Sequence, residues 1–224
     1  MGSSRKEILS NMLQAEIISP NNIERLASLK KEGVEFRDTL NLQIDELCEI
    51  EHPPLRDKPE EMRLKKKEYR ALYAERGVYC YFSWRRICVH ILEEDLLYIL
   101  RTARNHNVIG KDEQKCFGEI VIAIAGLSVG SSAARIAVLL GARRLRIADK
   151  DYIGPSNLNR MLCGVQDIGR LKAETVAESL YETDPYLDLF ASSSAINNET
   201  IDQFLGDHDA AAGIIIDEVD DLDA

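Results

Sequence analysis

The feature that most constrains the fold is a continuous apolar run, "IVIAIA" at 120–125, which ends in the small-residue turn "GLSVG" at 126–130. An apolar run without alternation is typical of a strand that is covered on both faces, as in a parallel sheet. Apolar residues at helical spacing follow the turn and predict a helix that ends near Gly141. We expect its buried positions to be Ala133, Ile136, Ala137 and Leu140.

The alternation of strand and helix continues to residue 218. Further strands are predicted at 145–149, 187–191 and 213–218, and further helices at 171–185 and 199–206. This order is typical of a Rossmann-like α/β fold, a doubly wound and mainly parallel sheet. In a sheet ordered 3-2-1-4, ligands bind at the carboxyl ends of strands 1 and 4.

Residues 5–115 have a different pattern, rich in charge and mostly helical. Helices are predicted within 21–33 and 59–77, with a loop, "HPPLRDKP", at 52–59. The aromatic segment "YCYFSW" at 79–84 fits either a short strand or a packing corner. We therefore expect a mostly helical N-terminal region, 5–115, followed by a nucleotide-binding domain, 116–224.

Composition excludes several classes of function. The net charge of −10 argues against a nucleic-acid partner, and no apolar stretch is long enough for a membrane span. The basic cluster "RLKKKEYR" at 63–70 is interleaved with glutamate, which is typical of a solvated helix face, with a docking patch as the alternative. The five cysteines show no metal-ligand spacing, so we expect reduced thiols in a cytoplasmic protein.

Two interpretations of the turn at 126–130 compete. It matches the G-x-S-x-G elbow of hydrolases, with Ser128 as nucleophile, but only His208 follows it and precedes the last predicted strand. It also fits a phosphate loop, because Gly126 and Gly130 allow close backbone approach at a helix N-terminus. The strand–turn–helix order favours the phosphate loop, in which the hydroxyls of Ser128 and Ser131 would contact the ligand.

Polar residues after the second strand indicate which nucleotide binds. Asp149 ends that strand, where a carboxylate accepts ribose hydroxyls. Two cations and two amides follow, and a compact triphosphate needs such donors more than NAD does. They are Arg160, Lys172, Asn157 and Asn159. The acidic segment after the fourth strand supplies candidate Mg²⁺ ligands, Asp217, Asp220 and Asp221.

Five motifs in order resemble the ThiF/MoeB adenylyltransferases, the family that includes ubiquitin-activating enzymes. The motifs are "GLSVGS", "ADKD" with Asp149 and Asp151, "SNLNR" with Asn157 to Arg160, "GRLK" ending at Lys172, and "DEVD" ending at Asp220, and the likeness covers roughly residues 100–224. The resemblance implies a ThiF-like fold that uses ATP and Mg²⁺. It places Asp149 at the ribose and Asn157, Arg160 and Lys172 at the phosphates.

The resemblance also implies partners and a reaction. Asp220 would lie by the Mg²⁺ and the attacking carboxylate, and Arg104, with Arg101 as second choice, would reach the nucleotide of the other subunit of a homodimer. The substrate would be a carboxylate on a peptide or a small ubiquitin-like or sulfur-carrier protein, activated as an acyl-adenylate. An NAD(P)-binding oxidoreductase domain and a non-catalytic ThiF-like scaffold remain as alternatives.

The sequence departs from the family pattern in three ways. The glycine loop is one residue shorter than the usual G-x-G-G-x-G, with Ser128 and Val129 where glycines are expected. The usual "D-C-T-D-N" is "D-E-V-D-D" here, which adds negative charge. The chain ends at Ala224, so we expect a domain truncated at its C-terminal end. The combination of motifs is similar to a bacterial subgroup in which a nitroreductase-like flavin domain follows.

Overall fold

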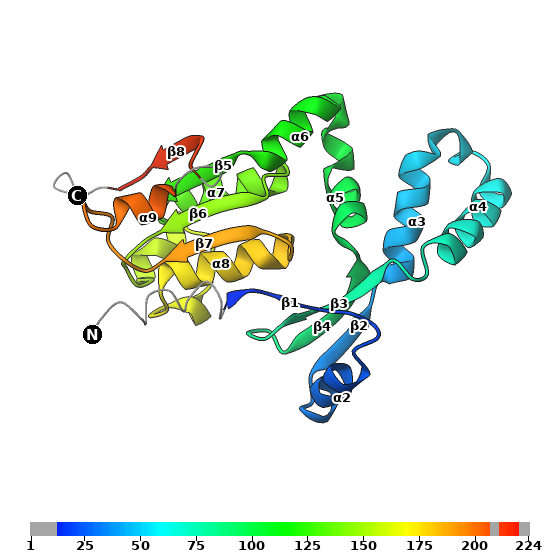
Figure 1. Ribbon diagram of the computed structural model, residues 1–224, viewed down its shortest axis with the longest axis horizontal. Coiled ribbons are helices and arrows are strands. Elements are labelled where there is room, and N and C mark those ends of the chain that lie inside the picture. The colour runs from blue at the N-terminus through cyan, green and yellow to red at the C-terminus, as the bar shows by residue number, and fades with distance from the viewer. Residues whose placement is uncertain (1–12, 207–210, 220–224) are drawn as a thin grey trace. The chain divides into compact units, whose positions relative to one another are not determined.

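The computed structural model describes residues 13–206 and 211–219. It divides into two compact units, each of which is described separately (Figure 1). The N-terminal unit comprises residues 15–107, and the Rossmann unit comprises residues 108–224 together with residues 1–14. The boundary between the units thus falls at Asn107–Val108, before the predicted domain boundary at 115–116.

The Rossmann unit contains a four-stranded parallel sheet. Its strands are β5 (Val121–Ala125), β6 (Arg144–Ala148), β7 (Asp188–Ser192) and β8 (Ile214–Asp217). They lie in the order β7-β6-β5-β8, which confirms the predicted order 3-2-1-4 (Figure 1). Every residue of β5 is buried, as expected for a strand covered on both faces.

Helices cover the two faces of this sheet. They are α6 (Lys111–Glu119), α7 (Gly130–Leu139), α8 (Lys172–Thr183) and α9 (Ile201–Leu205). The helices α7 and α8 pack together on the face of Ile124. On the opposite face, Phe204 of α9 packs against Ala123, Ala125 and Ala148. No helix in the described ranges is long and apolar enough to cross a membrane.

The predicted buried face of α7 is wrong in three of four positions. Its buried residues are Gly130, Ser131, Ala134, Ala137 and Val138. By contrast, Ile136 is 56% exposed and Leu140 is 40% exposed, and Ala133 is only partly buried. The start of the helix lies so close to β5 that a Cβ at Gly130 would meet Ile124, and small residues together with Val138 make up the buried face. Apolar periodicity alone therefore selected the wrong stripe.

The N-terminal unit is built on a second sheet. Its strands are β1 (Glu16–Ile18), β2 (Glu35–Asp38), β3 (Gly77–Phe82) and β4 (Ile87–Leu92), in the order β1-β3-β4-β2. The sheet is mixed, because β3 pairs antiparallel with β1 and β4, whereas β2 pairs parallel with β4. Its helices are α2 (Ile23–Lys31), α3 (Leu40–Glu51), α4 (Pro59–Leu72) and α5 (Glu94–Thr102), with short 3-10 turns η1 (Pro53–Leu55) and η2 (Ala103–Asn107).

This sheet corrects the expectation of a mostly helical region. The two helices predicted within 21–33 and 59–77 are present as α2 and α4, and the Asn22 side chain caps α2 by accepting from the backbone N of Arg25 at 3.2 Å. The segment at 79–84 is largely strand β3, one of the two predicted alternatives. The edge strands are only three and four residues long, too short to show alternation in the sequence.

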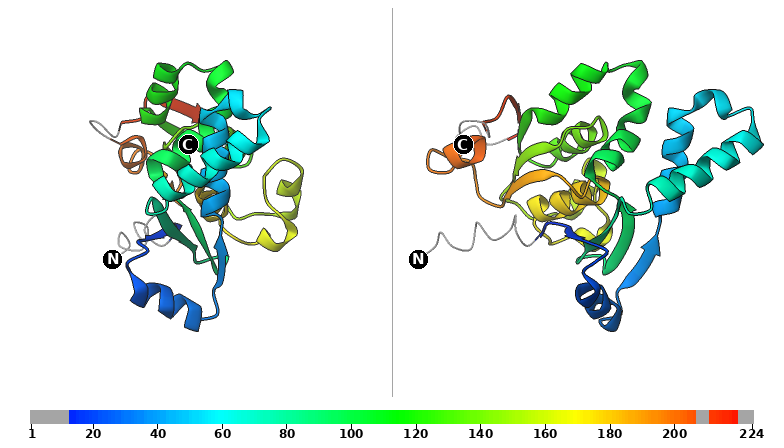
Figure 2. Two further views of the ribbon diagram at one scale, coloured as in Figure 1. Left: turned by 90° about the vertical axis from the view of Figure 1, so that its right-hand side faces the viewer. Right: turned by 45° about the vertical axis from the view of Figure 1, so that its right-hand side comes forward.

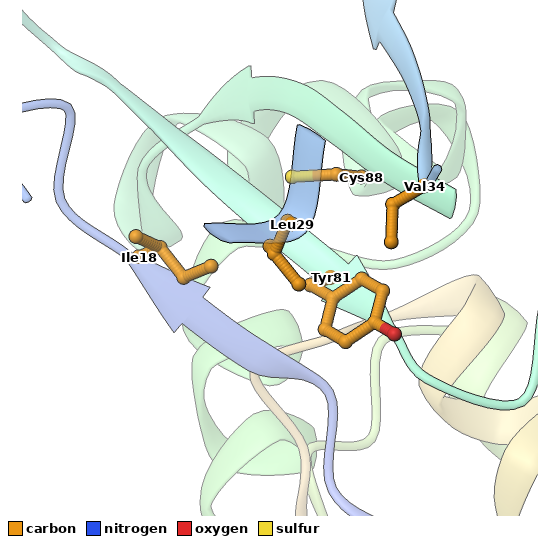
Figure 3. Close-up of a cluster of buried hydrophobic side chains, with 5 residues drawn as sticks. All are labelled: Ile18, Leu29, Val34, Tyr81 and Cys88. Atoms are coloured by element: carbon orange, nitrogen blue, oxygen red, sulfur yellow. The ribbon is translucent and has the colours of Figure 1, made fainter. Parts of the chain in front are cut away.

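The core of the N-terminal unit joins the sheet to α2. Buried Ile18, Leu29, Val34, Tyr81 and Cys88 pack together there (Figure 3). These residues come from β1, α2, the segment before β2, and the β3–β4 hairpin. Segments separated by up to 70 residues in sequence therefore hold the unit together.

Thiol labelling of the folded protein is expected to modify Cys116 before the buried cysteines. Cys116 is exposed on α6, whereas Cys48, Cys80 and Cys88 are buried, and none of these thiols is in a disulfide. Burial raises the pKa of Cys80 to about 12 and that of Cys88 to about 11. Because the thiolate is the reactive form, both should stay unreacted at neutral pH. Iodoacetamide labelling with peptide mass spectrometry, in buffer and in denaturant, measures this. Rapid native modification of Cys80 would contradict the prediction.

Candidate nucleotide-binding site

A cavity of about 900 Å³ opens at the carboxyl ends of the parallel strands in the Rossmann unit. Its walls come from the segments that follow β5, β6, β7 and β8, since the carboxyl ends of parallel strands meet at one edge of a sheet. Seven predicted site residues line it: Gly126, Ser128, Asp149, Asp151, Asn157, Arg160 and Lys172. The fold thus gathers most of the predicted site around one opening.

The glycines of the turn are required by internal packing. Gly126 has a φ of +82°, a conformation that L side chains rarely adopt, and a Cβ there would lie 2.5 Å from the carbonyl oxygen of Glu218. A Cβ at Gly130 would lie 2.9 Å from Cγ2 of Ile124. We predicted these glycines to admit a phosphate. The structure shows that they leave room for the backbone after β8 and for the side chain of Ile124, and the phosphate contact stays a prediction.

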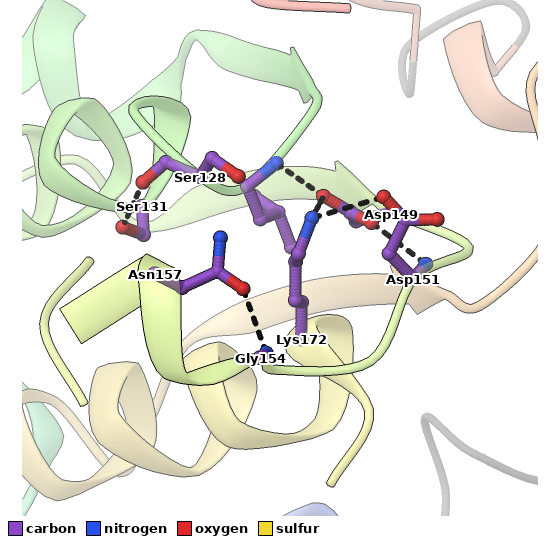
Figure 4. A network of polar contacts seen from close by, with 8 residues as sticks. Ser128, Ser131, Asp149, Asp151, Gly154, Asn157 and Lys172 are labelled. Carbon is purple, nitrogen blue, oxygen red and sulfur yellow. Dashed lines mark hydrogen bonds and ion pairs between the residues drawn. The ribbon is translucent and has the colours of Figure 1, made fainter. Parts of the chain in front are cut away.

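The N-terminus of α7 presents unpaired donors to the cavity. Its N-cap residue is Val129, and no described side chain caps the helix. The backbone N of Ser132 donates to the carbonyl of Val129 at 2.9 Å, so the N–H groups of Gly130 and Ser131 are the ones available to an anion. Ser128 and Val129 line the cavity, and among the described residues the Ser128 hydroxyl has no partner. Ser131 is buried and its hydroxyl donates to the carbonyl of Ser128 at 2.9 Å (Figure 4). Ser131 therefore stabilises the turn, in place of the ligand contact predicted for it.

Asp149 connects the turn to the end of β6. Its Oδ2 accepts from the backbone N of Leu127 at 2.7 Å, and its Oδ1 accepts from the backbone N of Asp151 at 2.8 Å. The ammonium Nζ of Lys172 lies 3.5 Å from Asp149 Oδ2 and 3.0 Å from Asp151 Oδ2 (Figure 4). Lys172 is 5% exposed. An ammonium has three N–H donors, and two of them can contact these carboxylates. The third N–H of Lys172 is therefore available to a ligand.

The position of Lys172 is set by the base of the loop 152–171. The backbone N of Ile153 donates to the carbonyl of Arg170 at 2.8 Å, which closes the loop. The Arg170 guanidinium lies 2.6 Å from Glu178 and 3.3 Å from Asp167, and these carboxylates raise the pKa of Arg170. Burial raises the pKa of Glu178, and Arg170 opposes that shift. The anchored loop base places Lys172 at the first position of α8.

The loop itself carries the remaining polar candidates. Asn157 is 7% exposed in the 3-10 turn η3 (Pro155–Asn159), and its Oδ1 accepts from the backbone N of Gly154 at 2.8 Å (Figure 4). Arg160 lines the cavity and donates to Oδ1 of Asn159 at 3.0 Å and to a backbone carbonyl of the same loop. Asn159 does not line the cavity. It contacts Arg160 instead.

The structure does not test the roles predicted for Arg104 and Asp220. Arg104 lies in η2 of the N-terminal unit, where its side chain is exposed, and the second choice, Arg101, is half-buried on α5. Asp220, predicted to be catalytic and to bind Mg²⁺, lies outside the described residues, as does Asp221. Within the described ranges no cluster of three metal-ligating side chains occurs, so the Mg²⁺ site stays a prediction.

Sequence reasoning missed several residues of the cavity. Glu218 lines it, whereas the predicted acid beside it, Asp217, does not and accepts from the backbone N of Val219 at 3.1 Å. Lys150 and the segment 194–196 after β7 also line it. Their only signal in the sequence is that each follows directly on a strand end. That signal is available once the strand order is known.

Comparison with known proteins decides the family. A sequence profile of the ThiF family matches residues 101–224, which is more than half of the chain. The chain belongs to the ThiF family. The matched range agrees with the span of roughly 100–224 expected from the five motifs, and the cavity described above lies within it. The nitroreductase-like domain expected after Ala224 stays a prediction.

The relatives are similar over parts of their lengths. An uncharacterized protein of Mycobacterium tuberculosis is 37% identical over 153 residues, which is 68% of this chain and 21% of that protein. A tRNA threonylcarbamoyladenosine dehydratase of Bacillus subtilis is 27% identical over 122 residues, which is 54% of this chain and 47% of that protein. The chain thus spans less than half the length of either relative.

Solved structures share the fold of the Rossmann unit. The tRNA N6-threonylcarbamoyladenosine dehydratase of E. coli, crystallised in complex with ATP, superposes with a TM-score of 0.53 at 21% identity. The likeness covers 58% of this chain and 52% of that chain. At this identity it shows the fold alone, and it confirms the predicted ThiF-like α/β class.

Proposed function

We propose that the Rossmann unit binds ATP and uses it to adenylate a carboxylate. The observation that carries this proposal is the convergence of an uncapped helix N-terminus, Arg160 and Lys172 on one cavity. Such donors suit a polyphosphate of about four negative charges better than a dinucleotide. Membership of the ThiF family and the ATP complex of the E. coli relative support the same assignment.

The residues present fit the parts of ATP. Asp149, at the end of β6, is the candidate for the ribose hydroxyls, since carboxylates accept from them at this position of Rossmann folds. The phosphates would receive donors from the turn 126–130, Lys172 and Arg160. Mg²⁺ would neutralise further phosphate charge, with Asp220 as the candidate ligand. The free hydroxyl of Ser128 favours an open phosphate loop over the hydrolase interpretation.

The proposed reaction is a displacement at phosphorus. An oxygen of the substrate carboxylate bonds to the α-phosphorus, and the bond to the bridging oxygen of pyrophosphate breaks, which yields an acyl-adenylate and pyrophosphate. A carboxylate is already ionised at neutral pH, so the step needs no general base. The chain's own contribution is positioning and charge stabilisation by helix N–H groups, Arg160 and Lys172. Lys172 is held ready for this role by its two carboxylates.

The substrate we favour is the C-terminal carboxylate of a peptide or a small ubiquitin-like or sulfur-carrier protein. The relatives from B. subtilis and E. coli are instead dehydratases of a modified nucleoside of tRNA. ATP–pyrophosphate exchange separates the two, with carboxylate peptides in one arm and bulk tRNA in the other. If neither the peptides nor tRNA stimulate exchange, the result would favour the alternative of a non-catalytic scaffold. The homodimer is also a proposal, in which the exposed Arg104 is available to a second copy.

An Arg160→Ala substitution is expected to weaken ATP binding about tenfold, the typical loss for one charge-assisted hydrogen bond. The Arg160 side chain donates only within its own loop, so the ATP-free melting temperature should stay unchanged. Thermal-shift titrations with ATP·Mg²⁺ and with NADH measure both quantities. Arg144→Ala is the matched control, because Arg144 begins β6 at the opposite edge of the sheet. Full ATP stabilisation of Arg160→Ala, or stabilisation by NADH alone, would contradict the proposal.

A further inference from the structure

A second cavity lies within the N-terminal unit, beside the helices α3 and α4. These two helices pack against each other and are drawn in light blue and cyan in Figure 2. Its volume is about 610 Å³. Pro59 and Met62 supply apolar lining, and Met62 is buried with its sulfur 4.0 Å from that of Cys48 on α3. The remaining lining is charged, with one acid and five cations: Asp45, Arg56, Arg63, Lys66, Lys67 and Arg70.

Three of the five cations are already paired with carboxylates. Arg70 donates to Asp45 at 2.7 Å, Arg63 lies 3.0 Å from Glu60, and Lys66 pairs with Glu49 of α3. Arg56 and Lys67 are exposed, and within the described part of the chain neither side chain has a hydrogen bond or ion pair. The cavity therefore carries uncompensated positive charge on a chain whose net charge is −10.

The arrangement differs from that of an ordinary solvated helix face. Arg63, Lys66, Lys67 and Arg70 follow the spacing i, i+3, i+4, i+7, so they form one stripe along α4. Like charges at this spacing repel each other, and an anion in the cavity would relieve the repulsion. Other lysines at α4, Lys58 and Lys65, are paired with glutamates three residues on and lie outside the cavity.

The shape of the stripe indicates the class of anion. From Arg63 to Arg70 the stripe extends about 10 Å along the helix, so the cations are spread out and do not converge on a single phosphate. The apolar lining suits side chains between the charges. Among the described residues no aromatic ring lines the cavity to stack a base, and the acidic chain repels a long polyanion beyond the cavity.

We propose that the α3–α4 cavity is a docking site for an acidic segment of a partner polypeptide. Carboxylates of that segment would pair with Arg56 and Lys67, and its apolar side chains would pack on Pro59 and Met62. The proposal does not rest on the proposed adenylation, because every residue that carries it lies in the N-terminal unit.

The test is fluorescence anisotropy of a short labelled peptide, rich in glutamate with leucines between, added to the full 224-residue chain. The double variant Arg56→Gln, Lys67→Gln should bind it at least about tenfold more weakly. The matched control, Lys58→Gln, Lys65→Gln, removes the same charge from the same segment, η1 to α4, and should change affinity less than about twofold. Arg56, Lys58 and Lys67 are exposed and Lys65 is partly buried, and circular dichroism melting checks that both variants fold.

Several outcomes would overturn the proposal. Equal losses in the two double variants would indicate non-specific attraction. Equal affinity for a glutamine counterpart of the peptide would remove the role of charge, and preferential binding of single-stranded RNA of matched charge would indicate a nucleic-acid surface. Absence of any peptide binding at low salt would exclude the site. Because ATP is left out of every arm, failure here leaves the proposed adenylation untouched.

Discussion

A Gly126→Ala substitution is expected to lower the free energy of unfolding of the Rossmann unit by about 4 kcal/mol, a loss that few single substitutions reach. Part of the loss is conformational, since the φ of +82° costs an L residue about 1–2 kcal/mol. The larger part is steric, because the new Cβ would lie 2.5 Å from the carbonyl oxygen of Glu218. That oxygen belongs to backbone and cannot rotate away. Chemical denaturation followed by circular dichroism measures the change.

Gly169→Ala is the matched control for this prediction. Gly169 has a φ of +87° in the same unit, but a Cβ there would meet nothing within 4 Å. It should therefore lose only the conformational part, about 1–2 kcal/mol. Similar losses in both variants would mean that the chain after β8 yields at low cost. The close packing of the turn against Glu218 would then have no role in stability.

The sequence predicts the Rossmann unit well because its apolar strand segments alternate regularly with helical segments along the chain. The run at 120–125 is buried on both faces as β5, and the strand order follows from the alternation of strand and helix. The same reasoning fails for α7, where Ile136 is 56% exposed and the buried face is made of small residues and Val138. Periodicity reports which residues are apolar, and the distance between elements decides which of them fit.

The N-terminal unit is harder to predict, because its sheet depends on contacts distant in sequence. The edge strand β2 (Glu35–Asp38) pairs with β4, some 50 residues later, and contains a single apolar residue, Phe36. No local pattern marks such a strand. Its partner β4 is an apolar segment of six residues, which periodicity alone does not distinguish from a buried helix.

The candidate site could also be predicted only in part from the sequence. Motif order identifies Asp149, Asn157, Arg160 and Lys172, and all four line one cavity. The sequence does not show that the carboxylate of Asp149 and the amide oxygen of Asn157 also accept from backbone N–H groups. These residues build the cavity as well as line it. Substitutions there will therefore change stability as well as binding, and an experiment must separate the two effects.

Lys172→Ala is expected to show both effects at once. Its ammonium is buried and lies between Asp149 and Asp151, so its removal leaves two neighbouring carboxylates without their shared cation. Breaking a buried pair in this way costs about 3 kcal/mol. We expect this lower value of the usual range because Asp149 keeps two backbone donors. ATP affinity should also fall at least about tenfold, because the ammonium group that would bind a phosphate of ATP is removed.

The comparison with Arg160→Ala and Lys115→Ala separates these effects. Urea denaturation without nucleotide should be unchanged for Arg160→Ala, whose side chain contacts only its own loop, and lowered for Lys172→Ala. Lys115 is exposed on α6 of the same unit, so Lys115→Ala should change neither stability nor ATP affinity. Unchanged stability of Lys172→Ala would show that Asp149 and Asp151 hold the turn without their cation. Lys172 would then serve the ligand alone, and its burial between two acids would have to be explained by nucleotide binding rather than by folding.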